Sequence, residues 1–138
     1  MAEITCSLTI AAPQEKVFRA LTSEDGIASW WTDDTMVARN EVRLGFENGS
    51  VTFRMKIAKM NPPELLEWEC IGDQQEWTGT KLSWVLRPTR EGGTNLSLAH
   101  VNWRDESEYF GDCQETWPEV LARLKAFAET GTADPYFK

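Results

Sequence analysis

The sequence predicts an α+β domain in which one curved antiparallel sheet of six or seven strands is covered on one side by a long C-terminal helix. Three observations lead to this fold class. Most segments alternate apolar and polar residues, which is the period of a half-buried strand. Asn-Gly, Asn-Pro-Pro and Gly-Gly stretches separate these segments and indicate chain reversals. The last long segment instead carries its apolar residues at helical spacing.

The first thirty residues predict one strand and two short helices. Apolar residues alternate with polar ones in "EITCSLTI", residues 3–10. The following "APQEKVFRALT" begins at Pro13, a residue favoured in a first helical turn. The hydroxyl of Ser23 can cap a second short helix, whose first turn is acidic. This helix is expected to end near the adjacent Trp30 and Trp31.

The middle of the chain predicts a meander of strands. Turns are expected at "ENGS" (47–50), "NPP" (61–63) and "EGG" (91–93). One parity of these strands is apolar and should face the core. Its residues are Val42, Leu44, Phe46, Val51, Phe53, Met55, Ile57, Leu66, Trp68, Cys70, Leu82, Trp84, Leu86, Leu96, Leu98 and His100.

The C-terminal segment predicts the covering helix. Asp105 with Glu108 forms a possible capping box, and Gly131 is a natural stop. Pro118 predicts a kink or a break. The apolar stripe consists of Phe110, Cys113, Trp117, Leu121, Leu124 and Phe127.

Composition excludes several classes of function. The 138 residues fit one domain, residues 1–138, with a net charge of −8 that argues against nucleic acid and anionic membrane surfaces. No signal peptide and no membrane-spanning stretch is visible, and the three cysteines form no C-x-x-C pair. We therefore expect a soluble protein of a reducing compartment, the cytoplasm.

No motif for a cofactor, a metal or catalysis is recognisable. His100 is the single histidine, and no zinc-binding spacing, nucleophile elbow, phosphate-cradling loop or dinucleotide fingerprint occurs. The cysteines are better interpreted as small core residues than as nucleophiles. We therefore expect no cofactor, no metal site and no dedicated catalytic residue, and we leave open whether the protein is an enzyme.

Several segments together resemble a known superfamily. They are "ITCSLTIAAPQEKVFRALT", the Trp30–Trp31 pair, "GTNLSLAH", "TWPEVLARLKAF" and the tail "TGTADPYF". Over essentially the whole chain the sequence resembles the SRPBCC, START-like or helix-grip superfamily. The likeness is to the branch of the C-terminal domain of the activator of heat-shock-protein-90 ATPase. Thr116-Trp117 departs from the Gly-Trp common in the family. The resemblance implies a hydrophobic cavity between sheet and helix, and a tail docked through Tyr136 and Phe137.

The aromatic residues on the inner faces are candidates to line this cavity. We expect two or three of the indoles to line it and the others to pack the core. Of the adjacent pair, one indole should enter the cavity and the other cover its mouth, while Trp77 should lie at the rim or surface. The candidate ligand-binding residues are Trp30, Trp31, Phe53, Met55, Trp68, Trp84, His100, Phe110, Trp117 and Leu121.

His100 has three interpretations. The favoured one is a buried neutral imidazole, hydrogen-bonded to the backbone or to a tryptophan N–H. A hydrogen bond to a ligand comes second. The role of a catalytic base comes third, because the sequence assigns no partner carboxylate to this histidine.

Three functions follow, in this order. The first is binding of a small hydrophobic or aromatic ligand, including a lipid. The second is a cyclase or aromatase that uses the same cavity, with His100 as the candidate for proton transfer. The third is a chaperone-associated domain acting in the stress response, whose outer sheet face (Arg54, Lys56, Glu67 and Glu69) would meet the partner. The sequence leaves the oligomeric state open.

Overall fold

The computed structural model describes residues 2–38, 40–46, 51–71, 79–103 and 108–137. These residues form seven strands and three helices, which confirms the predicted α+β class. In chain order the elements are β1 (Ala2–Ile10), α1 (Gln14–Thr22), α2 (Glu24–Trp30), β2 (Thr35–Ala38), β3 (Glu41–Phe46), β4 (Val51–Asn61), β5 (Leu65–Ile71), β6 (Lys81–Pro88), β7 (Thr94–Trp103) and α3 (Glu108–Thr130).

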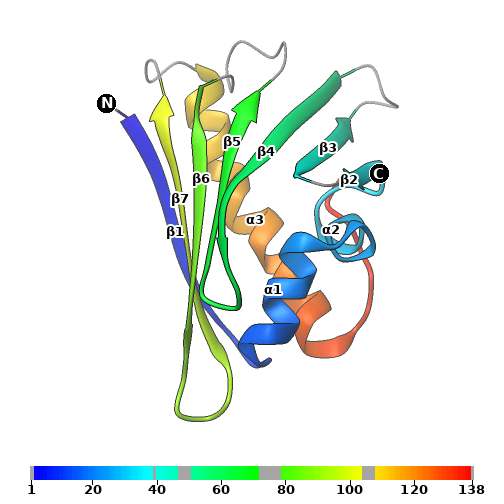
Figure 1. Cartoon of the computed structure of the whole chain (residues 1–138), viewed down its shortest axis with the longest axis vertical. Helices are drawn as coiled ribbons and strands as arrows, with labels where there is room; N and C mark the ends of the chain where they lie inside the picture. Colours follow the sequence, from blue (N-terminus) through cyan, green and yellow to red (C-terminus); the bar gives the residue numbers. More distant parts are fainter. Residues whose placement is uncertain (1, 39, 47–50, 72–78, 104–107, 138) are drawn as a thin grey trace.

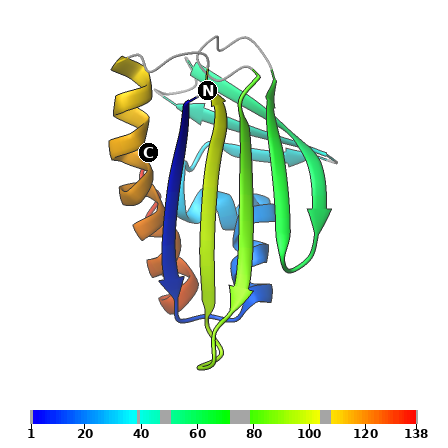
Figure 2. The same ribbon diagram turned by 90° about the vertical axis from the view of Figure 1, so that its left-hand side faces the viewer.

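The seven strands form one antiparallel sheet in the order β1-β7-β6-β5-β4-β3-β2. Strands β2 to β7 are a meander, and β1 adds to its far edge beside β7. The sheet curves around α3, and all three helices lie on its concave side (Figures 1 and 2). Because side chains alternate along a strand, one face of the sheet is buried against these helices.

The two short helices pack closely because their junction is small. Ser23 caps α2 as predicted, with its Oγ accepting a hydrogen bond from the backbone N–H of Gly26 at 3.0 Å. A Cβ added at Gly26 would lie 2.5 Å from Ser23 Oγ and 2.8 Å from Ala20 Cα. The indole N–H of Trp30 donates to the carbonyl of Ala20 at 2.8 Å, so the last residue of α2 is tied to α1.

Helix α3 continues through Pro118. Of the predicted kink or break, the break is therefore wrong. A proline removes one backbone hydrogen bond, whereas the stripe containing Trp117, Leu121 and Leu124 is almost completely buried along the sheet. The predicted stop is confirmed: α3 ends at Thr130, and Gly131 follows with φ 79°.

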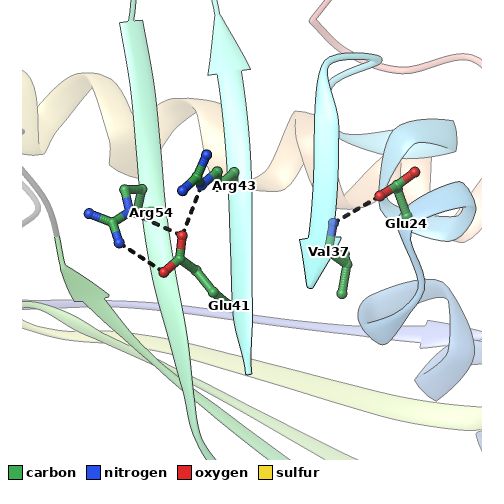
Figure 3. Close-up of polar contacts among 5 residues, drawn as sticks. All are labelled: Glu24, Val37, Glu41, Arg43 and Arg54. Atoms are coloured by element: carbon green, nitrogen blue, oxygen red, sulfur yellow. Dashed lines mark hydrogen bonds and ion pairs between the residues drawn. The ribbon is translucent and has the colours of Figure 1, made fainter. Parts of the chain in front are cut away.

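Polar contacts hold the β2 end of the sheet (Figure 3). Glu41 accepts hydrogen bonds from Arg54 at 2.9 and 3.0 Å and from Arg43 at 2.9 Å, and these lower the pKa of Glu41 to about 2. The backbone N–H of Val37, on the edge strand β2, donates to the carboxylate of Glu24 in α2 at 3.0 Å. This contact uses a donor of an edge strand that would otherwise be open to another chain.

Some sequence predictions fall outside the described residues or side chains. They include the Asn48-Gly49 hairpin, the cap at Asp105, the position of Trp77 and the inward direction of Phe46 and Val51. No helix in the described part of the chain is both long enough and apolar enough to cross a membrane.

Candidate functional site

Five tryptophans from four parts of the fold meet between the sheet and α3. Trp30 ends α2 and Trp31 follows it, Trp68 and Trp84 come from β5 and β6, and Trp117 comes from α3. Each is at most 3% exposed. Strand parity explains the inward direction of Trp68 and Trp84, and the apolar stripe of α3 explains that of Trp117. We call these five residues the tryptophan cluster.

The ring of Trp31 lies at the centre of the tryptophan cluster. It stacks on Trp30 with ring centroids 5.4 Å apart and on Trp68 at 6.2 Å, and it meets Trp117 at 5.1 Å. Trp84 contacts Trp30, Trp68 and Trp117 edge-on at 6.1, 5.4 and 6.1 Å. Offset or edge-to-face pairs of this kind each contribute about 0.5–1.5 kcal/mol beyond burial, so the five rings stabilise one another.

The rings of the adjacent Trp30 and Trp31 lie together in the core. Both are buried, and whether either borders the mouth of a cavity stays a prediction. The predicted turn does occur, because α2 ends at Trp30 and Trp31 is its C-cap. The rings do not diverge: they stack with an interplanar angle of 18°. Successive side chains point in different directions while a helix continues, but α2 ends at Trp30, and Trp31 lies just beyond it.

The indole N–H groups of the cluster fall into two kinds. Those of Trp30 and Trp117 donate within the protein, to the carbonyl of Ala20 and to Nδ1 of His100 at 3.3 Å. Those of Trp68 and Trp84 are buried, and neither has a hydrogen-bond partner in the described part of the chain. The sequence predicts that these indoles face inward, but it contains no signal that their donors lack a partner.

His100 is fully buried, and both of its ring nitrogens are engaged. An indole nitrogen can only donate, so Nδ1 accepts from Trp117 and the proton of the neutral ring lies on Nε2. Nε2 therefore donates to the hydroxyl of Thr80 at 2.9 Å. Burial lowers the pKa of His100 to about 3. The favoured interpretation, a neutral imidazole held by a tryptophan N–H, is confirmed, and use of His100 as a base requires one of these bonds to break.

The polar chain continues from Thr80 to Cys70. The Thr80 hydroxyl donates to the thiol of Cys70, and the backbone N–H of Cys70 donates to the Thr80 carbonyl at 2.9 Å. Burial raises the pKa of Cys70 to about 12, so the group stays a thiol at neutral pH. The order Trp117, His100, Thr80, Cys70 links α3 to three neighbouring parts of the sheet.

The remaining predicted site residues lie in the same hydrophobic core. Met55 and Leu121 are fully buried there, Phe110 is buried, and Phe53 is half-buried against them. The structure thus brings all ten candidate residues into one core. Whether they bind a ligand remains a prediction.

Sequence reasoning missed Trp103 as a core residue. Its ring is buried, 4.6 Å from that of His100 and 5.2 Å from that of Phe110. The alternation of β7 would place Asn102, not Trp103, on the inner face. Asn102 instead has φ 68°, and the pairing of β1 with β7 shifts register between Ala2 and Ile4. Asparagine tolerates this conformation better than most residues, which is the one weak signal the sequence offers.

The C-terminal segment Asp134–Phe137, which we call the strap, covers the end of α2. Backbone N–H groups of the strap donate to three successive carbonyls that the helix leaves without an internal partner. The pairs are Asp134 with Ser29 at 2.9 Å, Tyr136 with Trp30 at 3.1 Å, and Phe137 with Trp31 at 2.8 Å. The predicted docking of the tail is confirmed.

Side chains of α3 hold the strap from the other side. Arg123 forms an ion pair with Asp134 at 2.7 Å, and its guanidinium lies 5.6 Å from the ring centroid of Tyr136. The Tyr136 hydroxyl donates to the carboxylate of Glu119 at 2.7 Å. The strap therefore joins α3 to the backbone of the two tryptophans at the end of α2.

Comparisons with known proteins agree with this architecture. The solution structure of the Aha1 dimer from Colwellia psychrerythraea is 30% identical, with a TM-score of 0.85, over 95% of this chain and 98% of that one. A crystal structure from Mesorhizobium loti is 19% identical, with a TM-score of 0.77, over 90% of this chain and 94% of that one. At that identity the likeness shows the fold alone.

A protein of the dynemicin biosynthetic locus shares the fold over 95% of this chain and 48% of that one, with 19% identity and a TM-score of 0.74. No curated protein matches the chain. The family model described as "Activator of Hsp90 ATPase homolog 1-like protein" matches residues 11–129. The chain therefore belongs to this family of the helix-grip superfamily.

Proposed function

We propose that this protein binds a small hydrophobic or aromatic ligand in the interior between the sheet and α3. The observation that carries the proposal is the tryptophan cluster, in which rigid indoles from α2, β5, β6 and α3 converge. Walls of this kind, with a few buried polar groups among them, are typical of small-molecule sites. The half-buried ring of Phe53 and the buried side chains of Met55, Phe110 and Leu121 would complete the lining.

The electrostatics of the interior favour an apolar ligand. Among the described residues, His100 is the one buried polar side chain whose ordinary pKa lies near the physiological range, and burial keeps it neutral. Cys70 stays protonated. In a site without charged groups, the free energy of binding comes mainly from the apolar surface of the ligand that is removed from water, at about 25 cal/mol per Å².

Native mass spectrometry, compared with the denatured mass, tests the proposal first. Extra mass that leaves on denaturation, or tryptophan emission that changes on titration with an uncharged naphthalene, is the expected result. Trp31→Leu should weaken that response because Trp31 is the centre of the cluster. Met36→Leu, at a side chain that is 55% exposed, is the control and should leave it unchanged. A clean mass with no fluorescence response up to the solubility limit contradicts ligand binding.

A second candidate is a chaperone-associated role. It is favoured by the family match over residues 11–129 and by the 30% identical relative whose structure is called an Aha1 dimer. Under this candidate the purified protein stimulates the ATPase of heat-shock-protein 90 and co-elutes with it, and sedimentation shows a dimer. No stimulation and no co-elution at micromolar concentrations would remove it.

A further inference from the structure

We infer that the ligand is an uncharged molecule with a hydrogen-bond acceptor, such as a ketone, quinone or amide oxygen, which the indole N–H groups of Trp68 and Trp84 bind. This inference rests on the proposed function and names the class of ligand for the same site. Its starting point is the pair of buried donors that have no acceptor in the described part of the chain.

The rings of Trp68 and Trp84 lie close together on the inner face of the sheet. Trp68 pairs across to Leu82 and Trp84 to Leu66, so the indoles occupy diagonal positions on the neighbouring strands β5 and β6. Their ring centroids are 5.4 Å apart, and both side chains are fully buried. Buried polar groups in folded proteins nearly always have a partner, and each one left without a partner costs about 1–3 kcal/mol. A bound acceptor removes this cost.

The surroundings exclude a charged acceptor. The buried polar or charged residues of the described chain are Thr32, Thr80, Thr94 and His100, so no lysine or arginine is buried there. His100 is neutral and both of its nitrogens are engaged. A carboxylate, sulfonate or phosphate placed here would lose its hydration and meet no cation, which is strongly unfavourable. The indole donors are neutral and suit a neutral oxygen.

A pure hydrocarbon is also disfavoured, because it would leave both donors without an acceptor. The matching ligand thus has an aromatic or alicyclic body for the indole faces and one uncharged oxygen for the two N–H groups. Recognition of a polar group by buried donors discriminates more strongly than the fit of an added methylene does.

Three naphthalenes of nearly the same shape test this directly: acetylnaphthalene, ethylnaphthalene and naphthoate, each substituted at the same ring position. Affinities come from titration of the wild-type protein followed by tryptophan fluorescence. We expect acetylnaphthalene to bind roughly tenfold more tightly than ethylnaphthalene, as one or two net hydrogen bonds predict. Naphthoate should bind at least about tenfold more weakly than the ketone, because its charge is buried without compensation.

Variants assign the selectivity to the two donors. Trp68→Phe and Trp84→Phe keep an aromatic ring but remove the N–H, so the ketone-to-ethyl affinity ratio should fall toward one in the double variant. Trp30→Phe is the matched control: it removes an N–H that already donates to Ala20, so the ratio should persist. We compare the ratio of the two affinities because a general loosening of the core would lower the affinity for both ligands alike.

Nuclear magnetic resonance of the wild-type protein gives a readout that needs no variant to fold. The indole N–H signals of Trp68 and Trp84 should move downfield on addition of acetylnaphthalene but not of ethylnaphthalene, while that of Trp30 stays in place. Equal affinity for ketone and hydrocarbon, or tightest binding of naphthoate, overturns the inference and leaves the proposed function standing. Binding of none of the three, together with a clean native mass, overturns both.

Discussion

The buried imidazole of His100 predicts a loss of stability in mild acid. Its pKa is about 3 in the folded protein, against an ordinary value of 6.5. Below pH 6.5 the unfolded chain takes up a proton that the native state does not accept until about pH 3. The stabilisation is therefore complete above pH 6.5 and is lost as the pH falls toward 3, at about 1.4 kcal/mol per pH unit. Lowering the pH from 7 to 5 should cost about 2 kcal/mol.

Guanidinium unfolding at pH 7, 6 and 5 measures this loss, with His100→Gln as the comparison. Glutamine does not titrate, and its amide can accept from the Trp117 indole and donate to the Thr80 hydroxyl. The variant should be less stable at pH 7 but should lose much less stability than wild type between pH 7 and 5. Glu41, whose pKa is lowered to about 2, also loses stabilisation in acid, but only as the pH falls below its ordinary value of 4.5.

Equal losses in wild type and His100→Gln would refute the reasoning. They would mean that the folded protein already accepts a proton on His100 at pH 5, with the bond from Trp117 to Nδ1 lost. The hydrogen bond at Nδ1 makes this incompatible with the described arrangement, because a protonated Nδ1 cannot accept from the indole. Such a result would restore His100 as a group able to exchange protons with a substrate.

Three further perturbations follow from the packing. Gly26→Ala should lower the free energy of unfolding by about 2 kcal/mol, because the added Cβ would lie 2.8 Å from Ala20 Cα, and chemical denaturation measures it. Removal of residues 132–138 deletes three backbone hydrogen bonds to the end of α2, together with the bond from Tyr136 to Glu119 and the ion pair of Asp134 with Arg123. It should cost about 3 kcal/mol or more and raise acrylamide quenching of tryptophan emission; unchanged quenching contradicts the covering role of the strap. Arg54→Gln should cost less than about 1 kcal/mol in thermal unfolding, because its ion pair with Glu41 is largely solvated.

The sequence predicts the fold well because the decisive signals are local. Alternation within a strand is a property of a few consecutive residues, and it placed Trp68, Trp84 and His100 on the inner face. The cap at Ser23 and the stop at Gly131 are equally local, since each depends on the chemistry of a single residue next to a helix end. These features position the site without any knowledge of tertiary contacts.

The errors concern features that distant parts of the chain decide. The direction of Trp31 depends on rings from β5 and α3. Trp103 faces inward because of an irregularity at Asn102, and the alternating pattern of the strand does not show where such an irregularity occurs. Continuity of α3 through Pro118 depends on how much of the helix the sheet buries. In each case, packing overrides a local preference.

The two groups of buried polar atoms have different consequences for binding. The chain from Trp117 through His100 and Thr80 to Cys70 is satisfied, so a ligand that bonds to His100 must first break a contact between α3 and the sheet. The donors of Trp68 and Trp84 require no such exchange, because neither has an acceptor among the described residues that a ligand oxygen would have to displace. A change of ligand preference in a His100 variant would therefore arise through a displaced Trp117 rather than through a lost ligand contact. A His100→Gln variant that keeps the Trp117 bond should retain the preference, and that separates the two explanations.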